Sequence, residues 1–447
     1  MSAEAKPPSA ELSPLMTRLV RAASWTLAGA VGSQVLGFAG GLLTARLLGN
    51  ESFGQLSAVR GLLLAFGIFS GAGLGLAAVR YVAEFRDSDP ARMAGRIQFL
   101  QRLSWMCAGV TAVIAACLTP WMSDGWLGEG SLRNVLWLGC PLVLFNGLSA
   151  IQNGILGGLE KFKAIARGMA VEATGNLLGV VFGAKVAGMG GAVGGACVAG
   201  GVAWVYRRHL LRQEGIRLQA AEKRNFDKGW LLHEAMPFII AGTLSQPFEW
   251  FARLSLVRQP EGFVQLGYFS AAFTCAQVIA FLPRQFTVPG VALLAGLAKA
   301  QGAVTAVEVV RMNFKLLMLL ASLAAIPMLL AADFILRLFG FTAGGDVLVV
   351  LVLANVAGVC SGFFRTILSA SGKIWWQCGQ VLVWSVVLVL TWLALEEYGA
   401  LGLACAYLAA FVVVLFPQGR AARVCLQESG REDAKAGAGS ETKLCER

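Results

Sequence analysis

The amino-acid sequence predicts an all-α integral membrane protein with about twelve transmembrane helices. Three observations lead to this fold class. Of the 447 residues, 57% are hydrophobic and only 14% are charged, whereas a water-soluble chain carries about 25% charged residues. Long apolar runs, such as 347–358 and 381–395, suit membrane spans of about 20 residues better than one very large core. In addition, the second half of the chain repeats features of the first.

Apolar segments separated by polar loops define twelve candidate spans. We expect them at residues 22–48, 56–79, 103–122, 134–157, 169–188, 190–206, 231–257, 264–288, 314–333, 346–370, 374–395 and 400–417. The polar ends of the chain are expected to be disordered. The predicted organisation is an N-terminal arm (1–17), a first six-helix bundle (18–206), a basic linker (207–230), a second six-helix bundle (231–417) and a polar tail (418–447).

Lysine and arginine lie predominantly on one side of these spans. With the N-terminus in the cytoplasm, 29 of the 37 Lys and Arg residues fall in cytoplasmic segments. The opposite side holds only Arg46, Arg133, Lys185, Arg258 and Arg337. Because basic residues favour the cytoplasmic loops of membrane proteins, we expect both termini to be cytoplasmic. Two termini on one side require an even number of spans.

An internal repeat divides the chain into two halves. Ile155 and Lys161 are echoed by Ile367 and Lys373 at the same offset (367−155 = 212 and 373−161 = 212). The segment at 54–58 resembles that at 267–271, with an offset of 213. Because six spans is an even number, the two halves have the same orientation. Parallel repeats of this kind surround an axis along the membrane normal, with the substrate between them.

The composition excludes several classes of function. The net charge of +11 comes from basic residues scattered between apolar spans, which is typical of cytoplasmic loops and not of nucleic-acid binding. Ten cysteines form no CxxC pair and only two histidines occur, so we expect no metal site and no cofactor. The sequence has no Walker A motif, and its predicted external loops are too short for the acceptor site of a membrane polymerase. We therefore expect a transporter and not an enzyme.

Charged residues inside membrane spans are costly and are therefore functional candidates. Glu249 and Arg253 lie four residues apart in the seventh span and share one helix face. Pro247 precedes them and should loosen the local helix hydrogen bonding. The pair is either an anion-binding arginine beside an ion-coupling carboxylate, or a structural ion pair near the outer interface with Trp250 as a belt residue.

Further polar residues inside spans are candidate contacts to a substrate. Arg60 lies about one turn inside the second span, where it either contacts a phosphate in a central cavity or extends to the interface. Arg365 lies near the inner end of the tenth span. Asn146 and Asn153 share a face of the fourth span; they either line a polar cavity or, as we favour, bond to another helix. Arginine binds phosphate through a fixed fork of donors, so a phosphorylated lipid suits this set better than a neutral drug.

Short motifs occur in a fixed order along the chain. They are TARLLG at 44–49, FG at 53–54, RYVAE at 80–84, GYFSA at 267–271, SGK at 371–373 and YGALG at 398–402. With these motifs the chain resembles the polysaccharide-biosynthesis flippases over roughly residues 20–417. The family belongs to the multidrug/oligosaccharidyl-lipid/polysaccharide exporter superfamily. The resemblance implies a V-shaped pair of six-helix bundles. It also implies a bacterial cytoplasmic-membrane flippase that moves an undecaprenyl-diphosphate-linked oligosaccharide by alternating access, for lipopolysaccharide or exopolysaccharide synthesis.

The expected partners are membrane lipid, the lipid-linked oligosaccharide, and a polysaccharide polymerase and glycosyltransferases. Three alternatives stay open at this point. An ion-coupled multidrug antiporter of the same superfamily would use Glu249 as its ion site. A membrane glycosyltransferase or polymerase would transfer sugars to lipid acceptors. A non-catalytic assembly subunit would leave lipid movement intact when its intramembrane arginines are changed.

Overall fold

The computed structural model describes residues 14–85, 90–213, 244–301, 306–341, 343–370 and 374–445, and every regular element within these ranges is helical. This confirms the predicted all-α fold. The helices are α1 Pro14–Phe85, α2 Pro90–Trp121, the π-helical turn η1 Met122–Trp126, α3 Leu132–Gly158, α4 Phe162–Gln213, α7 Gln246–Val257, α8 Gly262–Gln301, α9 Ala306–Leu330, α10 Ala332–Leu338, α11 Gly345–Ala370, α12 Ile374–Ala394, the 3₁₀ turn η3 Glu396–Tyr398 and α13 Gly399–Cys445.

Nine helical segments of the described chain are long and apolar enough to cross a membrane. Two of them contain a backbone break, α1 at Gly49 with φ of 77° and α4 at Gly188 with φ of 59°. Glycine adopts this left-handed conformation without the steric penalty of a Cβ. Each break separates two predicted spans, so the nine segments account for eleven of the twelve. The other, the seventh, includes α7, while 231–243 lies outside the described residues. The chain is therefore a multi-pass membrane protein.

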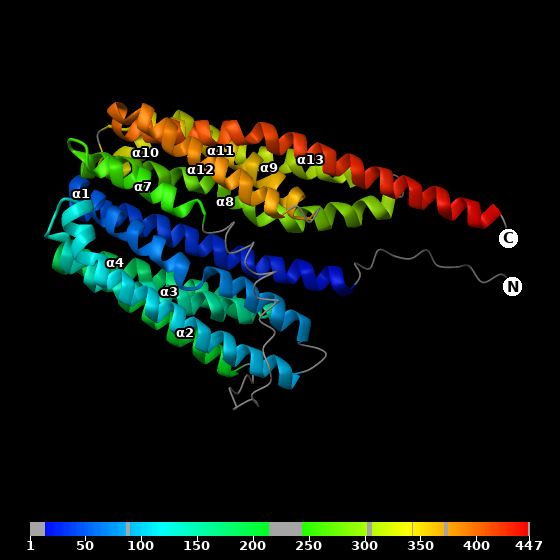
Figure 1. The fold of residues 1–447 in the computed structure, drawn as a ribbon, viewed down its shortest axis with the longest axis horizontal. Coiled ribbons are helices and arrows are strands. Elements are labelled where there is room, and N and C mark those ends of the chain that lie inside the picture. The colour runs from blue at the N-terminus through cyan, green and yellow to red at the C-terminus, as the bar shows by residue number, and fades with distance from the viewer. Residues whose placement is uncertain are drawn as a thin grey trace.

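The helices form two bundles, α1–α4 and α7–α13, which adjoin at one end and spread apart toward the other (Figure 1). The end where they adjoin holds α7 and α10; we call it the distal end. The opposite end holds the start of α1 and the last turns of α13; we call it the terminal end. This arrangement is the predicted V of two halves. The most extensive contacts between the halves are made by α1 against α7 and α8.

The two halves meet through glycines that are related by the sequence repeat. A Cβ added to Gly54 of α1 would lie 1.8 Å from the Phe263 carbonyl oxygen, and one added to Gly267 of α8 would lie 2.7 Å from the Asn50 carbonyl oxygen. The partners are related by the same offset (267−54 = 213 and 263−50 = 213). Small residues let helices approach closely, and the reciprocal contact indicates a pseudo-two-fold axis between the halves.

Two arginines, also related by the repeat, join the halves at the distal end. Arg46 Nε donates to the Leu338 carbonyl oxygen at 2.6 Å, and Arg258 Nη2 donates to the Gly125 carbonyl oxygen at 2.7 Å. Arg258 Nε also lies 3.4 Å from the Trp126 carbonyl oxygen. The offsets agree again (258−46 = 212 and 338−126 = 212). Each guanidinium thus satisfies carbonyl groups at the end of a short helix, where no intrahelical donor remains. We call these contacts the distal latch.

Aromatic rings support the latch on both sides. The Trp126 ring stacks on Trp250 of α7 with centroids 4.5 Å apart, and Phe38 of α1 meets Phe339 edge-on at 5.4 Å. Trp250 is therefore packed against the opposite bundle, which differs from the belt position considered for it. Aromatic pairs of this geometry add to the stability gained from burial. The distal end is consequently closed by stacked rings as well as by hydrogen bonds.

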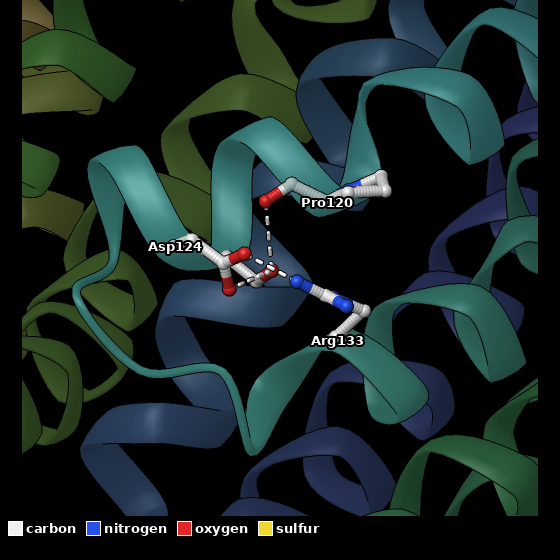
Figure 2. A network of polar contacts seen from close by, with 4 residues as sticks. Pro120, Asp124 and Arg133 are labelled. Atoms are coloured by element: carbon white, nitrogen blue, oxygen red, sulfur yellow. Dashed lines mark hydrogen bonds and ion pairs between the residues drawn. The ribbon is translucent and has the colours of Figure 1, made fainter.

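The turn that presents the Gly125 and Trp126 carbonyls is itself fixed by polar contacts (Figure 2). Arg133 of α3 forms an ion pair with Asp124, and Ser123 Oγ lies 3.1 Å from both the Pro120 carbonyl oxygen and Asp124 Oδ1. These contacts connect the end of α2 to the start of α3. They stay within the first bundle, so they shape the latch without joining the halves.

Several helices run past their expected limits. α1 begins at Pro14, inside the arm expected to be disordered, and α13 continues to Cys445 through the tail expected to be disordered. The tail contains alanine at 434, 436 and 438, a residue with high helix propensity, which helps it to extend α13. α4 runs to Gln213, so the linker expected at 207–230 begins as helix. Residues 214–230 of that linker lie outside the described residues.

We predict that Arg46→Ala combined with Arg258→Ala separates the halves at the distal end. Hydrogen bonds from charged donors stabilise the closed distal end. Losing both should therefore raise the ratio of molecules open at this end to molecules closed there on the order of tenfold. The measurement is the distance distribution between spin labels at Ser131→Cys and Glu397→Cys, one on each bundle, in a chain whose ten native cysteines are replaced. A second, longer distance should appear.

Arg102→Ala is the matched control, because it removes an exposed guanidinium of α2 that takes no part in the latch. It should leave the distance distribution unchanged. An unchanged distribution in the Arg46/Arg258 double variant would show that the latch does not hold the halves together.

Candidate substrate-binding site

A three-residue polar network lies in the second bundle. Tyr407 of α13 donates its hydroxyl to Glu249 Oε2 at 3.2 Å and accepts a hydrogen bond from Arg253 Nη2 at 3.2 Å. Arg253 Nη2 and Glu249 Oε2 are 3.7 Å apart. Glu249 lies in the first turn of α7, where the helix N-terminus favours a negative charge. Pro247 lies in the same turn, where its missing N–H disrupts no helix hydrogen bond, so it marks the start of α7.

Arg253 lies where the two bundles meet. Its guanidinium carbon is 4.8 Å from the Phe273 ring centroid and 5.7 Å from that of Phe269. It also lines a cavity of about 20 Å³ together with Ser57 and Gly61 of α1. Its Nε is buried without a hydrogen-bond partner. The ion pair with Glu249 therefore leaves part of the guanidinium free to bind another acceptor.

A larger polar cavity opens beside this network, within the second bundle, with a volume of about 240 Å³. Glu249 forms part of its wall, and Arg284 of α8 and Arg365 of α11 both line it. Among the described residues, neither of these guanidinium groups forms an ion pair. We call it the arginine cavity; its full lining is Ser245, Glu249, Arg284, Ser361, Arg365, Gln380, Val381, Trp384, Phe411, Val414 and Gln418.

The arginine cavity contains buried polar groups that lack partners. Both amide atoms of Gln380 are buried without a hydrogen bond, as are Trp384 Nε1 and Gln418 Oε1. Buried polar groups in proteins are nearly always hydrogen-bonded to protein or water. Two unpaired cations and several unsatisfied donors and acceptors therefore define a wall that suits an anionic, hydroxyl-rich ligand.

Arg60 lies in a separate cavity of the first bundle, of about 400 Å³, which it lines together with Glu172 and Asn176. It forms no ion pair within the described chain. Glu172 instead pairs with Arg207, whose side chain is only 1% exposed. Because Arg207 falls in the segment expected to be a solvated linker, the sequence reasoning missed its burial.

Asn146 and Asn153 lie on α3 and line neither of these two cavities. The Asn146 amide lies beside Gly67 of α1, where an added Cβ would be 3.7 Å from Asn146 Nδ2. The Asn153 side-chain oxygen is buried without a hydrogen-bond partner. The structure thus brings Glu249 and Arg365 to one cavity but places Arg60, Asn146 and Asn153 in the first bundle.

Sequence reasoning missed three further contributors to the arginine cavity. Arg284 lies at the inner end of the predicted span 264–288, where it counts among the cytoplasmic basic residues, and α8 continues as helix to Gln301. Gln380 lies inside the eleventh predicted span, where a polar residue among apolar neighbours was the available signal. Gln418 follows directly on the last predicted span and belongs to α13.

Solved structures with the same architecture are transporters. A multidrug resistance MATE family transporter of the MOP superfamily in an inward-facing conformation has a TM-score of 0.70 and 14% identity, covering 92% of this chain and 99% of its own. An outward-facing transporter of that family has a TM-score of 0.61 and 15% identity, covering 93% and 96%. A MOP superfamily transporter from Pyrococcus furiosus Vc1 (DSM3638) has a TM-score of 0.65 and 13% identity, covering 91% and 96%. The fold is that of the MOP transporters.

Sequence comparison gives the family. The polysaccharide biosynthesis protein family matches residues 19–292, and the chain belongs to this family. A similar curated protein is the "EPS I polysaccharide export inner membrane protein EpsE" of Ralstonia nicotianae (strain ATCC BAA-1114 / GMI1000), 28% identical over 193 residues. That match covers 41% of this chain and 43% of the relative. The resemblance found in the sequence is thereby confirmed at the level of family and fold.

We predict opposite effects on thermal stability for two neighbouring glutamines of α12. Gln377 donates to the Arg365 carbonyl oxygen at 2.8 Å, so Gln377→Leu should lower the Tm by a few degrees. Gln380→Leu removes a buried amide that has no partner, so it should leave the Tm unchanged or raise it. Thermal unfolding of the purified variants in detergent measures both. A drop in Tm for Gln380→Leu as large as that for Gln377→Leu would show that Gln380 serves packing and not a ligand.

Proposed function

We propose that this protein is a flippase that moves an undecaprenyl-diphosphate-linked oligosaccharide across the bacterial cytoplasmic membrane, for surface polysaccharide biosynthesis. The family and the transporter fold support movement of a polysaccharide precursor. The observation that carries the substrate class is the pair of unpaired guanidinium groups, Arg284 and Arg365, among unsatisfied amides in the arginine cavity. Arginine presents its donors in a planar fork that matches phosphate oxygens.

The chemistry of the substrate requires such a cavity. A diphosphate bearing sugars cannot cross about 30 Å of hydrocarbon unaided, because charged groups are poorly solvated there. A polar cavity within the protein replaces the water around the headgroup while the polyprenyl chain stays in lipid. Arg253, where the bundles meet, offers a third guanidinium next to the path between the halves.

The proposed orientation of the V in the membrane follows from the positive-inside rule. It places both termini, and so the terminal end, in the cytoplasm, with the distal latch at the outer face. The bundles then adjoin at the outer face and diverge toward the cytoplasm, and we propose that this arrangement loads a cytoplasmic substrate. Reopening at the distal end would release the headgroup to the outer leaflet. Polysaccharide polymerase and glycosyltransferases are the proposed functional partners, since they consume and supply this substrate.

Glu249 is the proposed ion-coupling residue. The sequence has no Walker A motif, so drive is proposed to come from an ion gradient, the membrane potential or removal of product. The carboxylate shares the Tyr407 hydroxyl with Arg253 and also lines the arginine cavity. Ion binding at Glu249 would therefore alter the partners of Arg253 directly.

A multidrug antiporter is the second candidate function. The same carboxylate beside a cavity favours it, since a cationic drug and a proton could compete for Glu249. The fold is shared with multidrug transporters and does not separate the two functions. The unpaired Arg284 and Arg365 favour the flippase over the antiporter, because their positive charges repel a cationic drug.

We predict that Arg253→Ala impairs flipping more than Arg253→Lys, since lysine retains the charge. Losing a charged hydrogen bond should slow flipping on the order of tenfold or more, and the lysine variant should keep an intermediate rate. The assay uses liposomes that contain the protein and a fluorescent polyprenyl-diphosphate oligosaccharide. A membrane-impermeant glycan-binding protein reports the leaflet in which the oligosaccharide lies.

Arg423→Ala is the control, because this exposed arginine in the middle of α13 lines neither the arginine cavity nor the cavities at Arg253 and Arg60. Normal flipping by Arg253→Ala at normal protein levels would refute a headgroup role for Arg253. Failure of the wild-type protein to move any of several diphosphate-linked glycans, with proton-coupled export of cationic dyes, would establish the antiporter instead.

A further inference from the structure

Another polar cavity, separate from those at Arg253, Arg365 and Arg60, lies outside the path between the two halves. It has a volume of about 90 Å³ and is built only by α2, α3 and α4 of the first bundle, near the terminal end. No residue of α1, α7 or α8, the helices that join the halves, lines it. Its wall is formed by Ile97, Gln101, Ser104, Trp105, Leu148, Ile151, Gln152, Ile155, Trp204, Arg208, Leu211 and Arg212.

Two arginines at the edge of this cavity lack an anion. Arg208 and Arg212 lie four residues apart and so share one face of α4. Both are exposed, and neither forms an ion pair within the described residues. The Arg208 guanidinium carbon lies 5.5 Å from the Trp204 ring centroid, which orients it. The adjacent Arg207, by contrast, faces inward and is neutralised by Glu172.

The interior of the cavity carries an unsatisfied polar side chain. Gln152 of α3 lines it and is only 5% exposed, and its Oε1 is buried without a hydrogen-bond partner. Ser104 is buried in the same wall, and its Oγ lies 3.5 Å from the Gly147 carbonyl oxygen. The site therefore offers two cations at its mouth and an unpaired acceptor inside. A phosphate ester that also bears a hydroxyl group satisfies both.

An apolar groove continues from the same place along the bundle surface. Trp204 belongs to both the polar cavity and this groove, which has a volume of about 840 Å³. Val198, Val202 and Val205 in its lining are all more than half exposed. Gly201 keeps the floor open, because a Cβ there would lie 3.3 Å from the Phe145 ring. Such an apolar, lipid-facing surface can accommodate an acyl chain.

We propose that the polar cavity and the groove together bind one anionic glycerophospholipid of the surrounding leaflet, with its phosphate at Arg208 and Arg212 and an acyl chain along the groove. Basic pockets between transmembrane helices on the cytoplasmic side are typical headgroup sites. The small cavity suits a single phosphate group with a glycerol, whereas a diphosphate with several sugars needs more room. This site is distinct from the arginine cavity and does not depend on the proposed function.

Native mass spectrometry of the purified protein tests this proposal. The protein is titrated with dioleoyl phosphatidylglycerol or with dioleoyl phosphatidylcholine, which share their acyl chains. The wild type should retain one phosphatidylglycerol in preference to phosphatidylcholine. Arg208→Gln with Arg212→Gln should weaken phosphatidylglycerol binding about thirtyfold. Each arginine near an anionic lipid raises the affinity about fivefold, and the two effects multiply.

Arg102→Gln with Arg423→Gln is the matched control, since it also removes two exposed arginines but leaves the site intact. It should retain phosphatidylglycerol as the wild type does. If the double variant at the site does not fold, Arg212→Gln alone replaces it, with an expected loss of about fivefold. An equal loss in the control would overturn the proposal in favour of diffuse charge attraction.

Two further outcomes would contradict the proposed occupant. Displacement of the lipid by inorganic phosphate at comparable concentration would identify a free-phosphate site. Preferential retention of undecaprenyl diphosphate, lost in the Arg208/Arg212 double variant, would assign the site to the transported substrate. Wild-type flipping by that double variant would support a site for a bound membrane lipid.

Discussion

A guanidinium group that leaves bulk water needs an acceptor, and the way each arginine meets this need organises the structure. Arg207 and Arg253 pair with carboxylates inside the two bundles. Arg46 and Arg258 donate to the carbonyl ends of short helices and thereby join the halves. Arg284 and Arg365 have no anionic partner in the described chain and face a polar cavity. Both side chains are exposed, and we propose that together they bind an anion from outside the chain.

The internal repeat also determines how the two halves meet. Reciprocal contacts through Gly54 and Gly267, together with the Arg46 and Arg258 hydrogen bonds, place a pseudo-two-fold axis at the distal end. The remainder of the interface spreads apart toward the terminal end (Figure 1). Few polar contacts hold the closed end in the part of the chain that the structure describes. In the proposed alternating access, the two bundles would rock around a site between or within them, so that one end closes as the other opens.

The sequence predicted the fold more completely than the site. Apolar runs and glycine breaks depend on local composition, so the spans, the two halves and their repeat were readable from the chain. The pairing of Glu249 with Arg253 also followed from helical spacing. Tyr407 as their common partner did not, because 154 residues separate it from Arg253. Arg284 was missed because it lies at the inner end of a predicted span, where a basic residue is expected to face the cytoplasm.

The central claim is that the arginine cavity receives the diphosphate of a lipid-linked glycan. Equilibrium binding of a polyprenyl-diphosphate oligosaccharide to the purified protein, compared with Arg284→Gln combined with Arg365→Gln, tests it most directly. We expect the double variant to bind at least about a hundredfold more weakly while keeping the wild-type Tm, since two charge-assisted bonds to phosphate are lost. Equal affinities for the two proteins would contradict the claim and place the headgroup elsewhere.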